Sequence, residues 1–176
     1  GHPGEDDIPS LVLLPQAAEA LDVPVVGCGG FSDAKSLVAA LALGAEGIAM
    51  GTRFMATKES LIHQNVKDKM TESDERSTNL MFRTMHNTAR VFKNTISDQV
   101  VEIESTGTAT FEDVQDLVAG QRGRGVFEVG DLEAGIWSAG ISVARVKDVP
   151  TCEELVSRMV SSAEAIMDGR LKEVRA

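Results

Sequence analysis

The chain has 176 residues, of which 43% are hydrophobic and 25% charged, a composition typical of an ordered globular protein. Its 27 acidic and 17 basic side chains give a net charge of -10, which repels nucleic acid phosphates and anionic membrane surfaces. No apolar run approaches the ~18 residues of a membrane span, and the two cysteines, Cys28 and Cys152, form no metal-type spacing. We therefore expect a cytoplasmic protein with a small-molecule partner and with neither a nucleic acid nor a membrane partner.

The first sixty residues alternate between helical and strand patterns, which indicates βα units and a parallel sheet. A helical spacing of apolar residues runs from Leu11 to Leu21, with Pro15 expected in or near the first turn. Val23–Cys28 and Gly47–Met50 are short apolar runs, typical of parallel strands buried on both faces.

Between these two strands lies a second predicted helix. Ser32 is its candidate cap, an apolar stripe extends from Ala34 to Ala42, and Gly44 supplies the stop. Each strand is thus followed directly by a glycine-containing corner.

Beyond Leu61 the pattern changes to charged, amphipathic segments. We predict helices at His63–Met70, Ser77–Phe92 and Phe111–Val118, and a short extended piece at Gln99–Ile103. Gly120 is expected to end the third of these helices, and the glycine-rich basic run 121–125 is expected to be an irregular loop.

Two more helices are predicted towards the end of the chain. Apolar residues between Leu132 and Val146 could share one helix face, with Gly135 and Gly140 allowing a neighbour to approach closely. The last helix has the clearest signal, because Thr151 and Glu154 form a capping box ahead of a regular apolar stripe.

The glycine corners carry the strongest functional signal. In a βα barrel the active site lies at the C-terminal ends of the strands, where a phosphate often binds after the last two. Gly29–Gly30 and Gly51–Thr52 lack bulky side chains, so backbone amides can approach an anion, and each following helix points its positive end there. A tight turn is the alternative for either pair alone, but two corners on adjacent βα units predict phosphate binding.

His2 is the candidate proton-transfer residue. It lies in the loop-like run GHPGEDD ahead of a βα unit, and a histidine's unperturbed pKa of about 6.5 suits proton transfer near neutrality. An exposed loop histidine without a role is the alternative. His63 and His86 lie in the charged helical region, and for them we favour no catalytic role.

Other polar clusters have simpler explanations. Three consecutive carboxylates at residues 5–7 cannot all face one ion from a regular strand or helix, so we expect a solvated loop or an approach to a helix N-terminus. Arg122 and Arg124 could pair with an anionic ligand, with solvation as an equal alternative. Trp137 is most simply a packing residue, with a pocket-lining role as the alternative.

Taken together, these motifs resemble a known family. The run Val25–Thr57 is similar to the FMN-phosphate region of the nitronate monooxygenase (2-nitropropane dioxygenase) family, including the interval between the two corners. GHPGEDD, NTAR at 87–90, GQRGR at 120–124 and GIWSAG at 135–140 resemble the NADH:quinone reductase branch of that family. The resemblance covers nearly the whole chain and implies an α/β fold, the C-terminal portion of a TIM (β/α)8 barrel with its last two strands and an appended helical domain.

The resemblance also implies site residues and a cofactor. FMN would be held by Gly29, Gly30, Phe31, Met50, Gly51 and Thr52, and His2 would match the active-site histidine beside the flavin ring. No metal is implied.

The implied activity is FMN-dependent oxidation of nitronates or nitroalkanes with dioxygen. One alternative is an FMN-dependent NADH:quinone reductase with NADH as electron donor. A second alternative is an inactive isolated fragment of such an enzyme. The oligomeric state is left open, with a homodimer as one of the forms considered.

The expected domain organisation has three parts. Residues 1–60 would form the C-terminal βα units of the barrel, 61–130 a helical domain on the substrate side, and 131–176 helices that pack back on the barrel. A complete barrel takes ~250 residues. With 176 residues, we expect this chain to be a C-terminal part in which six barrel strands are absent.

Overall fold

The computed structural model of the chain describes residues 4–174. Its first part alternates helices and strands in the order α1 (Ser10–Ala20), β1 (Val26–Cys28), α2 (Ala34–Ala42) and β2 (Gly47–Ala49). β1 and β2 pair in parallel, with Val26 opposite Gly47 and Cys28 opposite Ala49. The predicted parallel βα arrangement is confirmed, although both strands are shorter than expected.

Local hydrogen bonds fix both ends of α2. The Asp33 carboxylate accepts from the Ser36 amide at 2.9 Å and the Ser36 hydroxyl accepts from the Asp33 amide at 3.0 Å, which is a capping box. The predicted cap at Ser32 is therefore wrong by one residue; the Ser32 amide donates to the Ser36 hydroxyl instead. Gly44 has a φ of +90° and ends the helix as predicted.

The last long helix, α7 (Cys152–Asp168), packs against α2 and is followed by α8 (Arg170–Glu173). Its predicted capping box is confirmed, because the Glu154 amide donates to the Thr151 hydroxyl at 3.1 Å and the Glu154 carboxylate accepts from the Thr151 amide at 2.7 Å. Leu155, Met159 and Ala163 of the predicted apolar stripe form one core with Ala34 and Val38 of α2. Val156 and Val160, predicted in the same stripe, are exposed. Burial of this stripe holds the end of the chain on the first βα units.

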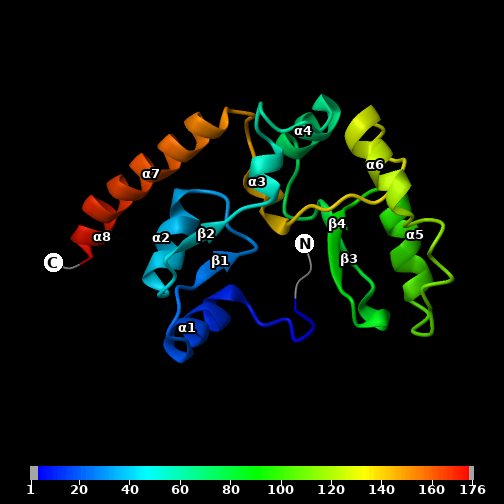
Figure 1. The fold of residues 1–176 in the computed structure, drawn as a ribbon, viewed down its shortest axis with the longest axis horizontal. Coiled ribbons are helices and arrows are strands. Elements are labelled where there is room, and N and C mark those ends of the chain that lie inside the picture. The colour runs from blue at the N-terminus through cyan, green and yellow to red at the C-terminus, as the bar shows by residue number, and fades with distance from the viewer. Residues whose placement is uncertain (1–3, 175–176) are drawn as a thin grey trace.

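Two groups of elements are visible in Figure 1. β1 and β2 lie with α1, α2 and α7. A second sheet, formed by β3 (Thr78–Met81) and β4 (Ala89–Phe92), lies with α5 (Thr95–Glu104) and α6 (Gly120–Val129). Between the groups lie α3 (Thr52–Met55) and α4 (Gln64–Thr71), and α4 corresponds to the predicted helix at 63–70. Both α3 and α4 contact the short 3-10 helix η2 (Ile141–Arg145).

Residues 78–92 form a β-hairpin, so the predicted helix at Ser77–Phe92 is wrong. β3 (Thr78–Met81) and β4 (Ala89–Phe92) pair antiparallel around the 3-10 helix η1 (Arg83–Met85). Phe82 and His86 flank η1 with φ values of +64° and +51°, which an α-helix cannot contain. Only Met81 of β3 and Ala89, Val91 and Phe92 of β4 are buried, so the hairpin lacks the regular alternation that identifies a strand from its sequence.

The region that follows β4 also differs from the sequence prediction. Residues 99–103, predicted as extended, lie inside α5, whose capping box joins Asn94 and Ser97. Residues 111–118, predicted as a helix, form turns, and Gly120 begins α6 instead of ending a helix. The run 121–125, predicted as a loop, is therefore helical.

Gly123 of α6 and Gly135 after it allow the two backbone segments to contact each other directly. A Cβ on Gly123 would lie 2.7 Å from the Ile136 carbonyl oxygen, and a Cβ on Gly135 would lie 2.7 Å from the Arg122 backbone. Neither backbone atom can move without shifting its whole segment. The close approach expected at Gly135 is thus confirmed, and the low helix propensity of glycine is tolerated because it permits this contact.

The predicted helix across 132–146 is wrong outside η2. Ser138 instead makes an isolated antiparallel bridge with Val91, and the Phe92 amide donates to the Trp137 carbonyl at 2.9 Å. The apolar side chains are still buried, in a core that comprises Ala56, Val66, Met70, Phe92, Val126, Trp137, Ala139, Val143 and Val146. The apolar pattern thus predicted which part of the segment contributes to the core, although the predicted helix does not form.

The β1–β2 unit leaves apolar surface uncovered. Leu11 is 71% exposed, Val26 is 53% exposed and no residue of β2 is fully buried, so the predicted burial of both strands on both faces is wrong for this chain. Pro15 is the sixth residue of α1 and thus lies beyond the first turn expected for it. Among residues 4–174, no helix combines the length and apolar character needed to cross a bilayer.

Two glycines of α6 give a matched test of the close contact. Gly123→Ala should lower the free energy of unfolding by about 1–3 kcal/mol, because the added methyl group collides with a backbone carbonyl. A Cβ on Gly125 meets nothing within 4 Å, so Gly125→Ala should raise the free energy of unfolding by about 0.5–1 kcal/mol through helix propensity. Urea unfolding followed by circular dichroism measures both, and equal effects of the two variants would contradict the contact.

Candidate functional site

The two glycine corners lie at the same end of one sheet. β1 and β2 are adjacent and parallel, and Cys28 and Ala49 are opposite each other at their last positions. Gly29 and Met50, the next residues, therefore leave the sheet at the same edge. This is the C-terminal edge of the strands, where α/β proteins place their ligands.

The first corner depends on two left-handed glycines. Gly29 has a φ of +93° and Gly30 a φ of +85°, values that side-chain-bearing residues rarely adopt. A Cβ at either position would meet no heavy atom within 4 Å. The corner is thus open, and its main chain can be approached closely.

Phe31 turns its ring away from this opening. A Cβ on Gly27 would lie 2.9 Å from the Phe31 ring, which packs with Leu14, Ala40 and Ala45. Only its main chain could therefore contact a ligand at the corner.

The N-terminus of α2 is already occupied by a side chain. The Asp33 carboxylate accepts from the Ser36 amide and from Arg145, whose Nη2 lies 2.8 Å away. These two hydrogen bonds lower the pKa of Asp33, against the opposing effect of desolvation, which is the largest single contribution. Donors for an anion at the first corner would thus come from the loop rather than from the first turn of α2.

The second corner is held against the segment 135–140. Gly51 precedes α3 with a φ of −87°, and a Cβ there would meet nothing within 4 Å. The Thr52 hydroxyl accepts from the Gly140 amide at 2.8 Å. Since a hydroxyl both accepts and donates, Thr52 keeps a proton available for an anion.

Trp137 and His63 have structural roles. Trp137 is 1% exposed and stacks on Phe92 with ring centroids 4.2 Å apart, which agrees with packing as the simplest interpretation. His63 caps α4, because its Nδ1 accepts from the Asn65 amide at 3.2 Å. Arg122 donates to the Ala134 carbonyl at 2.7 Å and so supports α6 rather than a ligand.

The loop after His2 is tied to the hairpin by contacts that sequence reasoning missed. The Glu5 carboxylate accepts from the Thr88 amide at 2.7 Å and from the Thr88 hydroxyl at 2.6 Å. Asp7 receives two hydrogen bonds from Arg83, at 2.7 and 3.0 Å. Residues 5–7 are therefore not simply a solvated loop, and in residues 4–174 no group of His, Cys, Asp and Glu is arranged to hold a metal ion.

These contacts lower the pKa values of two carboxylates, and two residues of this region have strained backbone conformations. Hydrogen bonds from Thr88 lower the pKa of Glu5, and those from Arg83 lower the pKa of Asp7. Asp7 and His86 have left-handed φ values of +53° and +51°, which are uncommon for residues other than glycine. Such strained residues cluster at functional sites. His2 itself lies outside the described residues, so its position is not part of this geometry.

Comparison with known proteins agrees with the motifs. The sequence profile described as nitronate monooxygenase matches residues 1–162. A Rhodococcus jostii (3aS,4S,5R,7aS)-5-hydroxy-7a-methyl-1-oxo-octahydro-1H-indene-4-carboxyl-CoA dehydrogenase is 28% identical over 93% of this chain and 56% of its own length. A probable nitronate monooxygenase of Bacillus subtilis is 29% identical over 89% of this chain and 44% of its own length.

The fold agrees as well. The structure of FabK from Thermotoga maritima superimposes with a TM-score of 0.90 at 26% identity, over 99% of this chain and 54% of that one. The α/β arrangement thus matches a neighbour of the TIM-barrel family. The chain spans about half the length of the curated relatives that it matches. With the profile match over most of its length, the chain belongs to the nitronate monooxygenase family.

Proposed function

We propose that this chain provides the FMN-phosphate side of a flavin-dependent oxidoreductase active site that oxidises nitronates or nitroalkanes with dioxygen. The observation that carries the proposal is the placement of two open glycine corners at the same edge of adjacent parallel strands. The family supports a flavin as the cofactor, and FMN fits because its phosphate is a terminal dianion. When bound, FMN would supply the redox chemistry by accepting electrons from the substrate.

The residues at the corners suit this phosphate. Gly29, Gly30 and Phe31 would offer main-chain groups from the first corner, and Met50, Gly51 and Thr52 from the second. Phosphate recognition by backbone amides needs close approach, and no side chain fills the space that a Cβ would occupy at Gly29, Gly30 or Gly51.

The proposal includes a place for the chain in a larger fold. β1 and β2 would be the last two strands of a (β/α)8 barrel, which fits the half-length match to relatives and the exposed apolar side chains around β1. Residues 61–130 would cover the substrate side of the flavin, and 131–176 would pack back on the barrel. The bridge between Val91 and Ser138 joins these two parts.

His2 would hold or move a proton beside the flavin ring. The structure describes the chain from residue 4, so the support comes from the loop that follows His2. Two carboxylates of that loop are fixed on the hairpin by Thr88 and Arg83. We propose that Glu5 and Asp7 position the loop, and with it His2, towards the substrate side.

Gly51 gives the sharpest test of the phosphate site. Gly51→Val should weaken FMN binding by about tenfold or more, because the side chain would fill the space of the anion and remove charge-assisted hydrogen bonds. Its φ of −87° and open surroundings predict little loss of fold stability. Gly47→Val is the matched control, since Gly47 lies at the other end of β2 and is equally open. Flavin fluorescence titration measures both; full FMN loading of Gly51→Val would contradict the site.

His2→Asn tests proton transfer. In the flavin-loaded protein it should retain FMN and slow turnover of a neutral nitroalkane by about 10²–10⁴-fold, the usual contribution of a positioned acid or base. Turnover of the preformed nitronate should fall much less, because its proton is already gone. Oxygen consumption with each substrate separates the two steps, and equal rates for variant and parent would remove the role of His2.

Anaerobic mixing tests the choice of substrate. The loaded protein should lose its oxidised flavin absorbance when mixed with a nitronate. Rapid bleaching by NADH, without a nitronate, would instead favour the quinone reductase alternative.

The anchor at Glu5 predicts a pH-dependent contact. Because the folded-state pKa of Glu5 is lowered, its stabilising contact with Thr88 is fully present above the ordinary glutamate pKa of about 4.3 and is lost as the pH falls through the lowered value. The NMR shift of the Thr88 amide should therefore titrate with a midpoint below about 4.3. Glu5→Gln should abolish this transition; a midpoint above the ordinary value would show that the contact does not form.

A further inference from the structure

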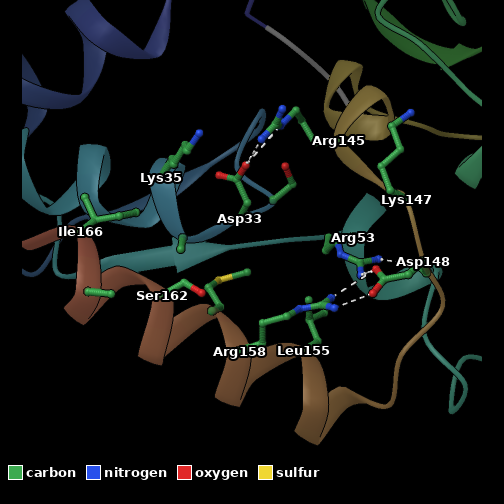
Figure 2. Close-up of a pocket in the computed structure, with 14 residues that line it drawn as sticks. Asp33, Lys35, Arg53, Arg145, Lys147, Asp148, Leu155, Arg158, Ser162 and Ile166 are labelled. Carbon is green, nitrogen blue, oxygen red and sulfur yellow. Dashed lines mark hydrogen bonds and ion pairs between the residues drawn. The ribbon is translucent and has the colours of Figure 1, made fainter. Parts of the chain in front are cut away.

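A cavity lies between α2 and α7, next to the glycine corners. It has a volume of about 540 Å³, within the usual range for small-molecule sites. Figure 2 shows its charged side chains around β2 and the face of α7. None of the six proposed FMN residues lines it, although Ser32 and Arg53 of its lining closely follow the two corners in the chain. Ile48 and Met50 pack with α7 on this side of the sheet. The cavity is thus on the helix-covered face and adjoins the corners.

The residues that line the cavity carry a net positive charge, whereas the chain as a whole is negatively charged. Five cationic residues line it together with two carboxylates, Asp33 and Asp148; the cations are Lys35, Arg53, Arg145, Lys147 and Arg158. Three positive charges are therefore in excess, in a chain whose net charge is -10. A concave surface of one sign concentrates ligands of the opposite sign.

The carboxylates neutralise only part of this charge. Asp148 lies between two guanidinium groups, with its oxygens 2.6 Å from Arg53 and 2.6 Å from Arg158. Arg53 is 3% exposed, and both its desolvation and the nearby charge of Arg158 lower its pKa. One carboxylate thus balances two cations, and another anion here would be stabilised.

Lysines complete the cationic side. Lys35 is exposed at the start of α2, and within the described residues it has neither a hydrogen bond nor an ion pair. Lys147 donates to the Ser73 carbonyl at 2.7 Å, a neutral partner that leaves its charge uncompensated. Figure 2 shows Lys35 beside the Asp33–Arg145 pair.

The floor of the cavity is apolar. Leu155, Met159 and Ile166 come from one face of α7 and line the same space, and Ser162 lies on that face between them. A ligand there would contact charge at one side and hydrocarbon at the other.

We propose that this cavity binds an organic phosphate monoester, with its dianionic head near Arg158 and its apolar body on Leu155 and Met159. A doubly charged head matches the excess of cations better than a carboxylate does. The cavity adjoins the proposed FMN site, but the two share no residue.

Hexyl phosphate is a suitable probe for titration calorimetry with the chain. It should bind more tightly than inorganic phosphate, which lacks the apolar body, and than hexanoate, which has a single charge. Arg158→Gln should weaken it by about tenfold, the usual effect of one charged hydrogen-bond partner. Lys172→Gln is the matched control, because Lys172 pairs with Asp168 on the surface and does not line the cavity.

A variant without charge change gives a second, independent readout. Ser162→Phe should fill the cavity and abolish hexyl phosphate binding, while thermal unfolding shows an intact fold and FMN binding stays as in the parent. The proposal is overturned if the parent chain does not bind hexyl phosphate, if binding survives Ser162→Phe, or if Lys172→Gln weakens binding as much as Arg158→Gln. Equal affinity for inorganic phosphate would likewise contradict an amphipathic ligand.

Discussion

The parallel pairing of β1 with β2 is the constraint on which the candidate site depends. Because Cys28 and Ala49 are opposite each other, β1 and β2 end at the same edge of the sheet, and both glycine corners lie there. An antiparallel pair would place the corners at opposite ends, and no choice of residues could then let them share an anion. The stripe of α7 that buries the outer side of α2 keeps this small sheet covered on one face.

Local sequence signals predicted those features that depend on neighbouring residues. The capping box of Thr151 and Glu154 and the stop at Gly44 were found because each operates within one turn of helix. The open corners followed in the same way from glycines directly after apolar strands. For these elements, contacts across the chain were not needed.

Long-range contacts explain what the sequence did not reveal. The hairpin reverses direction through Phe82 and His86, which have left-handed conformations. Its turn is held by Glu5 and Asp7, which lie near the N-terminus of the chain. Gly123 is tolerated in α6 because a larger residue would collide with the Ile136 backbone. Glycine thus has two physical uses in this chain, a left-handed turn at the first corner and close backbone contact in α6, and composition alone does not distinguish them.

The segment 135–140 touches both parts of the chain. Its Trp137 carbonyl accepts from the Phe92 amide of β4, and its Gly140 amide donates to Thr52 at the second corner. Two residues separate these two attachments, too few to absorb a large displacement by uncoiling. Any movement of the hairpin must therefore carry Gly140 along or break its bond to Thr52, which would make the proposed phosphate contact at the second corner sensitive to whatever lies against the hairpin.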